Sequence, residues 1–312
     1  MSGGWKPQRE IDILAGTPPG GGLDRTAHAL LDAFAARQLL NVPARVVNIP
    51  GDGARKVWAS VDARAGDAHV LCISSPNLTT DYLTGLAVFS HDNYTPLAIL
   101  YNEYIAFVTR SDSSYRSAGD LLKRLRDNAG KVTVALSTAA GNPNHIALAQ
   151  VVRHAGGDVR APVIRVFDSA LDAVADVVAG NADIAAVTAA SAVGALEAGT
   201  LRALAVSAPV RLAGCYTHTP VWRELDVPCT LGAWRGVHGA HALSADQIAY
   251  WESTLSAATR SPSWVAELTR HFLTPMLVTG AALREHLVQE KAQMAEMLTA
   301  LGFSMTKKSL IK

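Results

Sequence analysis

The segment Gly16-Thr17-Pro18-Pro19-Gly20-Gly21-Gly22-Leu23-Asp24 joins a strand-like run, Ile11-Asp12-Ile13-Leu14, to a helix-like stretch that starts at about Asp24. The helix-like stretch has one apolar stripe with the spacing i, i+3, i+4, i+7, made of Ala27, Leu30, Leu31 and Phe34. A stripe of this kind is typical of a helix that covers a sheet. The segment is therefore predicted to connect a strand to a helix in an α/β fold.

The same alternation continues on the C-terminal side of this segment. Residues 44–49 and 70–73 are strand-like, 54–63 are helix-like, and the rhythm restarts at about 104–108. This order is typical of βαβ units in a doubly wound, parallel sheet.

A second α/β unit is predicted in the middle of the chain. Ser117 and Asp120 form a capping box that opens a helix, and Gly199 suits the end of a helix over 191–198. The other expected elements are strands at 132–136, 163–167 and 204–206 and helices from His145 and from Ser169 to about Gly180.

After Trp234 the pattern is largely helical, with Ser244 capping a helix to Ala258 and a long helix at about 281–301. These helices have no evident strands of their own, so we expect them to return to the first unit. The predicted lobes are 1–103 with 232–312, and 104–231, joined by a hinge with two crossings near residues 103 and 232.

Composition narrows the function classes. Of 312 residues, 49% are hydrophobic and 18% charged, which indicates a folded chain. The formal net charge of +1 gives no basic excess for nucleic acid. The most apolar region, 174–196, is interrupted by polar residues, so no membrane span is expected. Cys72, Cys215 and Cys229 form no CxxC pair, which argues against a zinc ribbon or a disulfide framework.

The glycine segment is a candidate anion site. It is expected at the carboxyl end of a strand and at a helix N-terminus, where unpaired N–H groups and the helix dipole favour an anion. Neither GxGxxG nor GxxxxGK[ST] is present, so a small anion such as a carboxylate fits better than a nucleotide. Two alternatives stay open: the segment is only a tight turn with Asp24 capping the helix, and Arg25 is only solvated.

Three further loops follow predicted strands. Ser137-Thr138-Ala139-Ala140-Gly141-Asn142-Pro143-Asn144-His145 offers hydroxyl, amide and backbone donors. His145 is either a ligand contact or general base, or a helix-start histidine bonded to its own loop. Phe167-Asp168-Ser169, in which Ser169 could simply be an N-cap, and Ser74-Ser75-Pro76-Asn77 complete the set.

Several of these motifs, in this order, resemble one known family. They are Gly16 to Asp24, Asn142-Pro143-Asn144-His145, Val163 to Ser169 followed by Val178-Ala179-Gly180-Asn181-Ala182-Asp183, and Gly199-Thr200-Leu201-Arg202-Ala203-Leu204-Ala205-Val206. The chain resembles, from about Glu10 to Phe303, the Bug or TctC-type extracytoplasmic solute receptors of tripartite tricarboxylate transporters. The resemblance implies a type II periplasmic-binding-protein fold with an interlobe ligand cleft, no metal, no cofactor and no catalysis.

The resemblance also implies which residues bind the ligand. The first loop would hold one carboxylate through backbone N–H groups and waters, the second loop would complete that grip, and Asp168, Thr188 and Ser75 would face the rest of the ligand. The full set of expected ligand-binding residues is Thr17, Pro18, Pro19, Gly20, Gly21, Gly22, Asp24, Arg25, Ser75, Asn77, Ser137, Thr138, Ala139, Gly141, Asn142, Asn144, His145, Phe167, Asp168 and Thr188. Ala139-Ala140, Phe167 and Ala186-Val187-Thr188-Ala189 depart from the common family pattern, which leaves the identity of the acid open.

The expected partners are a small organic acid (a dicarboxylate, tricarboxylate or aromatic carboxylate) and membrane transporter subunits, with no nucleic acid and a monomeric chain. The family implies a periplasmic location, but no signal peptide is evident in the first seven residues, because a leader was removed or none existed. This keeps two alternatives open: a cytoplasmic isomerase, hydratase or decarboxylase using His145, Asp168 and Arg25, or a metabolite sensor. His238-Gly239-Ala240-His241 is a weak metal candidate.

Overall fold

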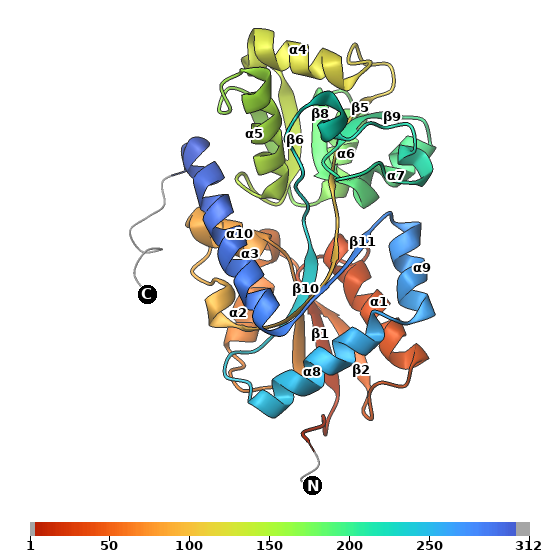
Figure 1. The fold of residues 1–312 in the computed structure, drawn as a ribbon, viewed down its shortest axis with the longest axis vertical. Helices are drawn as coiled ribbons and strands as arrows, with labels where there is room; N and C mark the ends of the chain where they lie inside the picture. Colours follow the sequence, from red (N-terminus) through yellow and green to blue (C-terminus); the bar gives the residue numbers. More distant parts are fainter. Residues whose placement is uncertain (1–3, 304–312) are drawn as a thin grey trace. The chain divides into compact units, whose positions relative to one another are not determined.

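The computed structural model describes residues 4–303, which divide into two compact units. Unit 1 contains residues 4–82, 86–102 and 234–292, and unit 2 contains residues 83–85, 103–233 and 293–303. Each unit is built on one β-sheet with helices around it (Figure 1). None of the helices in the described part of the chain is both long and apolar enough to span a membrane.

Unit 1 has a six-stranded sheet in the order β11-β4-β10-β3-β1-β2. β1 pairs in parallel with β2 and β3, whereas β10 is antiparallel to β3 and β4, and β11 is antiparallel to β4. The strands are β1 (Ile11–Ala15), β2 (Ala44–Asn48), β3 (Val70–Ser74), β4 (Thr95–Asn102), β10 (Arg235–Gly239) and β11 (Thr274–Val278). The helices are α1 (Gly22–Ala36), α2 (Arg55–Asp62), α3 (Asn77–Leu83), α8 (Ala245–Ala258), α9 (Pro262–Arg270) and the first part of α10 (Gly280–Ala300), with 3₁₀ turns η1 (Asp52–Ala54) and η2 (His91–Asn93).

Unit 2 has a five-stranded sheet in the order β7-β6-β8-β5-β9. β6 is parallel to β7 and β8, and β5 is antiparallel to β8 and β9. The strands are β5 (Ile105–Arg110), β6 (Thr133–Ser137), β7 (Val163–Phe167), β8 (Ile184–Thr188) and β9 (Leu201–Val206). The helices are α4 (Ala118–Asn128), α5 (Pro143–Ala155), α6 (Ala170–Val178) and α7 (Ala189–Glu197), with 3₁₀ turns η3 (Ala129–Lys131), η4 (Gly214–Tyr216) and η5 (Trp222–Leu225).

The predicted α/β class is confirmed, and so are several local signals. Ser117 and Asp120 form a reciprocal capping box at α4, Ser244 caps α8 in the same way with Gln247, and Gly199 has the positive φ of +69° expected just after α7.

Two expectations about the sheets are wrong. Both sheets are mixed rather than parallel, and the C-terminal region contributes strands β10 and β11 as well as helices. β10 has the sequence RGVHG, all of it buried, so its two glycines and two polar residues hide the apolar pattern of an inner strand. β11 contains Pro275, which a strand tolerates at a sheet edge.

Large aromatic side chains fill the core of each unit. In unit 1, Trp251 is fully buried and its indole N–H donates to the Ala68 carbonyl at 2.9 Å. In unit 2, the rings of Phe107 and Trp222 meet edge to face, with centroids 5.0 Å apart. These cores hold rigid the strands whose ends carry the predicted binding loops.

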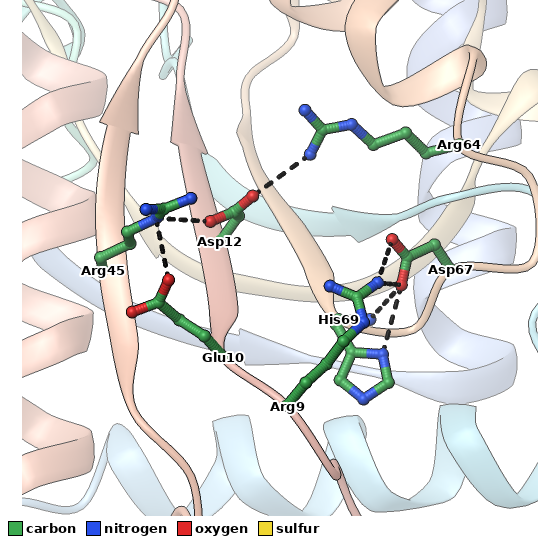
Figure 2. Close-up of polar contacts among 7 residues, drawn as sticks. All are labelled: Arg9, Glu10, Asp12, Arg45, Arg64, Asp67 and His69. Carbon is green, nitrogen blue, oxygen red and sulfur yellow. Dashed lines mark hydrogen bonds and ion pairs between the residues drawn. The ribbon is translucent and has the colours of Figure 1, made fainter.

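A network of charged side chains joins the start of β1 to its neighbours in unit 1 (Figure 2). Asp12 and Arg45 are register partners across β1 and β2, and Arg45 Nε donates to Asp12 Oδ1 at 2.8 Å. Arg64 approaches the other carboxylate oxygen at 3.4 Å, and Glu10 contacts Arg45 at 3.3 Å. Asp12 therefore helps to fix the pairing of the strand that leads into the glycine segment.

We expect Asp12→Ala to lower the free energy of unfolding by about 1 kcal/mol, because a half-buried carboxylate loses two charged partners. Glu10→Ala is the matched control, since Glu10 is more exposed and its one ion pair among residues 4–303 is the 3.3 Å contact with Arg45; its expected loss is below about 0.5 kcal/mol. Urea unfolding at low and high NaCl measures both values, and the Asp12 effect should shrink with salt. Equal losses for the two variants would contradict this role of Asp12.

Candidate functional site

The glycine segment follows β1 and is closed by hydrogen bonds to the first turn of α1. The backbone N–H of Gly20 donates to Asp24 Oδ2 at 2.8 Å, and the N–H of Asp24 donates to Thr17 Oγ1 at 3.2 Å. Gly20 has a φ of +82°, which glycine adopts without strain. The N-cap of α1 is Gly21, so Asp24 lies inside the helix and braces the preceding turn instead of capping.

Asn48, at the end of β2, is a residue of this loop that sequence reasoning missed. Its side-chain amide donates to Asp24 Oδ1 at 2.7 Å and to the Thr17 carbonyl at 2.9 Å. Asn48 pairs in register with Ala15, the last residue of β1, which explains its reach. The feature of the sequence that could have indicated Asn48 is its position, a polar residue at the carboxyl end of the strand next to β1.

The start of α1 keeps two backbone donors available. Among the described residues, no acceptor is assigned to the amide groups of Gly22 and Leu23, because Pro18 and Pro19, four residues earlier, lie in a turn that does not continue the helix; the Pro18 carbonyl accepts from the Gly21 N–H instead. A helix N-terminus with such amides favours an anion.

Two guanidinium groups approach this helix end from within unit 1. A Cβ atom placed on Gly22 would lie 3.7 Å from Nη2 of Arg235 and 4.0 Å from Nη2 of Arg25. Arg25 also folds back to donate to the Gly20 carbonyl at 3.3 Å, so it lies over the turn. Arg235, on β10, is 9% exposed and was not predicted as a site residue. The space in front of Gly22 is thus bordered by cationic groups and backbone donors.

The second loop, in unit 2, is braced in a similar way by uncharged groups. Asn142 is the N-cap of α5: its side-chain oxygen accepts from the His145 N–H at 3.1 Å and its amide donates to the Ser137 carbonyl at 2.6 Å. Asn144 donates to Ser137 Oγ at 3.3 Å. Thr138 has a φ of +67°, a left-handed conformation that is strained for a β-branched residue. Its N–H donates to the Phe167 carbonyl at 2.7 Å, which holds the strained residue in place.

His145 is buried and bonded to its own loop. Its Nδ1 atom accepts from the Gly141 N–H at 3.0 Å, and the side chain faces Phe303 edge to face. Burial lowers the pKa of His145 to about 4, so the ring is neutral at pH 7 with its proton on Nε2. This geometry matches the second interpretation of His145, a helix-start histidine bonded to its own loop. A ring whose Nδ1 accepts a hydrogen bond and whose pKa is low is a poor general base at neutral pH.

The other predicted residues also lie at the carboxyl ends of strands. Thr188, the last residue of β8, shares a 2.8 Å hydrogen bond with Ser191, and Ser75 follows β3 and is buried. Asp168 is exposed after β7, and the neighbouring Ser169 is the N-cap of α6. Within unit 1 the structure therefore groups the predicted residues at the ends of β1 and β3, and within unit 2 at the ends of β6, β7 and β8.

The weak metal candidate does not form a ligand pair. His238 is buried on β10, where its Nε2 lies 2.7 Å from Nδ1 of His91, whereas His241 is exposed. Across residues 4–303, no group of three or more His, Cys, Asp or Glu side chains is arranged to hold a metal ion.

Residues 32–302 match the family TctC, described as "Tripartite tricarboxylate transporter family receptor". The chain belongs to this family. The TctC-type resemblance predicted from the sequence is thereby confirmed. A curated relative, the "UPF0065 protein in tcbD-tcbE intergenic region" of Pseudomonas sp. (strain P51), is 27% identical over 181 residues. That match covers 57% of this chain and 52% of the relative, so the chain spans about half the length of that protein.

Solved structures of this TctC chain's neighbours support the two-unit fold. The R. palustris protein Rpa4515, solved with adipate, is 18% identical with a TM-score of 0.85 and covers 96% of this chain and 99% of its own. MatC from Rhodopseudomonas palustris, with bound malate, is 18% identical with a TM-score of 0.76 over 94% and 99%. A TctC solute-binding protein from Polaromonas is 22% identical with a TM-score of 0.70 over 94% and 99%. At these identities the likeness establishes the fold.

The state of His145 gives a pH prediction. Because its folded pKa is lowered, its neutral form stabilises the fold above pH 6.5, and this contribution of about 3 kcal/mol is lost as pH falls through 4. Nitrogen-15 NMR should show an Nε2-protonated ring at pH 7 that titrates near pH 4. His145→Gln should remove about one proton from the pH dependence of unfolding between pH 6.5 and 4, while His154→Gln, on an exposed histidine of the same helix, should not. A ring that titrates near 6.5 would contradict the assignment.

Proposed function

We propose that this TctC protein is a receptor for a small organic acid and holds one carboxylate of that acid at the start of α1. The observation that carries the proposal is the pair of Gly22 and Leu23 amides bordered by the Arg25 and Arg235 guanidinium groups. Backbone N–H groups at a helix N-terminus together with guanidinium groups are the donors that carboxylates prefer.

Both loops are held in shape by their own hydrogen bonds, which supports tight binding without large ordering costs. Asp24 and Asn48 brace the first loop, and Asn142 and His145 brace the second. A micromolar Kd requires about −8 kcal/mol. Charge-assisted hydrogen bonds contribute about 1.5–3 kcal/mol each, so four to six such contacts would suffice once the cost of association is subtracted.

We infer a dicarboxylate as the substrate class. The related proteins Rpa4515 and MatC were solved with adipate and malate, and both of these acids are dicarboxylates. The remaining predicted contacts, Ser75, Asn77, Thr138, Phe167, Asp168 and Thr188, are proposed to set the length and polarity of the acid that is accepted.

The proposed role is that of a periplasmic receptor which delivers its solute to membrane transporter subunits and does not convert it. Family membership supports this role, and the low pKa of His145 argues against acid–base chemistry there. Incubation with the bound acid followed by mass analysis tests this point. An unchanged acid is expected, and conversion that is lost in Asp168→Asn would favour the enzyme alternative instead.

A glycine-to-alanine pair tests the carboxylate site. A methyl group on Gly22 meets no atom closer than 3.7 Å, so Gly22→Ala should fold, but the methyl group would stand where the acid approaches the amides. We expect adipate and malate to raise the melting temperature of the wild type, and Gly22→Ala to weaken their binding at least tenfold by calorimetry. Gly194→Ala, at a helical position with open space, is the control and should bind normally. Undiminished binding by Gly22→Ala would refute the site, and the absence of any stabilising dicarboxylate would refute the substrate class.

A further inference from the structure

A buried polar cluster in unit 1 belongs to neither binding loop. It consists of Trp234, His91 of η2, His238 of β10, and His286 and Glu290 of α10; we refer to it as the Trp234 cluster. The indole N–H of Trp234 donates to Glu290 Oε1 at 2.7 Å, and His286 Nε2 lies 4.0 Å from the same oxygen. His91 lies beside Trp234, with ring centroids 5.7 Å apart, and stacks on His238.

Several buried polar atoms of this cluster lack a hydrogen-bond partner among the described residues. Among the described residues, Glu290 Oε2, His286 Nε2, His91 Nε2 and His238 Nδ1 have no hydrogen-bond partner. A buried carboxylate with one donor is costly, whereas a protonated carboxyl avoids burying the charge. Burial raises the pKa of Glu290 to about 7, and the Trp234 hydrogen bond offsets only part of this effect.

The cluster fastens a helix that both units share. α10 belongs to unit 1 up to Ala292 and to unit 2 from Gln293, and Trp234 is the first residue of the segment that returns to unit 1. The unit-1 part of α10 is also held by a small apolar group, in which Leu283 and Leu287 pack with Ile99 and Trp234. Two polar contacts lie at its ends: the Gly280 N–H donates to Glu252 Oε1 at 3.1 Å, and Lys291 pairs with Asp92. The Trp234–Glu290 hydrogen bond thus reinforces a modest hydrophobic contact.

We propose that Glu290 is a proton-operated latch that sets how firmly residues 280–292 of α10 are held on unit 1. When this part of the helix opens, Glu290 enters water and its pKa returns towards 4.5. The closed state therefore prefers the protonated carboxyl, and its stability falls as pH rises from about 4.5 through 7.

The other titratable groups that face Glu290 act in defined directions. Burial lowers the pKa of His91, of His238 to about 3, and of His286, so their protonation below about pH 6.5 favours opening. Lys291, next to Glu290, pairs with Asp92 of η2 at 3.2 Å and lies 5.0 Å above the Tyr82 ring, at the exposed edge of the cluster. The helix is consequently held most firmly in a window of mildly acidic pH and loosens on either side of it.

Hydrogen exchange of the ligand-free protein tests the latch. With pKa values of 4.5 open and about 7 closed, the opening equilibrium of 280–292 should rise about 30-fold between pH 5.5 and 8 relative to that of Glu290→Gln. Glutamine keeps an acceptor for Trp234 but cannot ionise, and the histidine effects cancel in the ratio. Glu285→Gln, on the exposed side of the same helix, is the matched control and should show no such step relative to the wild type.

A direct carbon-13 titration of the Glu290 carboxyl in the wild-type chain keeps the test independent of any variant. A midpoint near 7 supports the latch, and a midpoint near 4.5 overturns it. A wild-type to Glu290→Gln exchange ratio that stays constant from pH 5.5 to 8 would also overturn it. Since no ligand is present in either experiment, failure of the latch is distinguishable from failure of the proposed receptor function.

Discussion

The hydrogen bond from the Gly20 N–H to the Asp24 carboxylate is the constraint on which the first loop depends. Both oxygens of the buried Asp24 side chain accept hydrogen bonds from the protein, because Asn48 donates to the second oxygen. The Gly20–Asp24 bond helps to fix the direction of the nearby Gly22 and Leu23 amides, for which no acceptor is assigned among the described residues. Asp24 thus braces the turn in front of the α1 N-terminus, where the anion site is proposed, through hydrogen bonds on both of its oxygens.

In the second loop, the hydrogen bonds that fix its shape come from neutral groups. Asn142 joins the loop to the start of α5, and His145 replaces a carboxylate as the acceptor of a glycine N–H. The histidine can do this only as long as Nδ1 carries no proton, which burial ensures at neutral pH. Strain at Thr138 is held by the bond to Phe167, so β7 also takes part in fixing the loop. The two loops are thus rigid for different chemical reasons.

Local signals in the sequence predicted much of the fold, whereas long-range partners remained hidden. The capping residues Ser117 and Ser244 bond to residues three positions further along the chain, so the sequence alone is enough to predict them. β10 is inner to its sheet only because β3 and β4 flank it, and its sequence RGVHG does not reveal this. Asn48 and Arg235 reach the glycine segment from β2 and β10, and sequence separation conceals both contacts. For His145 the sequence left two interpretations, and only the position of the Gly141 N–H decides between them.

Two buried acidic residues of unit 1 show how the number of donors decides what such a group can do. Asp24, with its side chain 6% exposed, receives hydrogen bonds from Gly20 and Asn48 on separate oxygens and has His28 at 3.5 Å. Glu290, 13% exposed, receives one hydrogen bond and leaves its other oxygen buried without a donor. A carboxyl group with donors on both oxygens is suited to a fixed brace, because any change of its state would break the loop that it supports. A carboxyl group with one oxygen unsatisfied has a low-cost alternative, the uptake of a proton, and so its environment can respond to pH. The first kind lies in the glycine segment, where the anion site is proposed, and the second kind lies on α10, whose residues belong to both units.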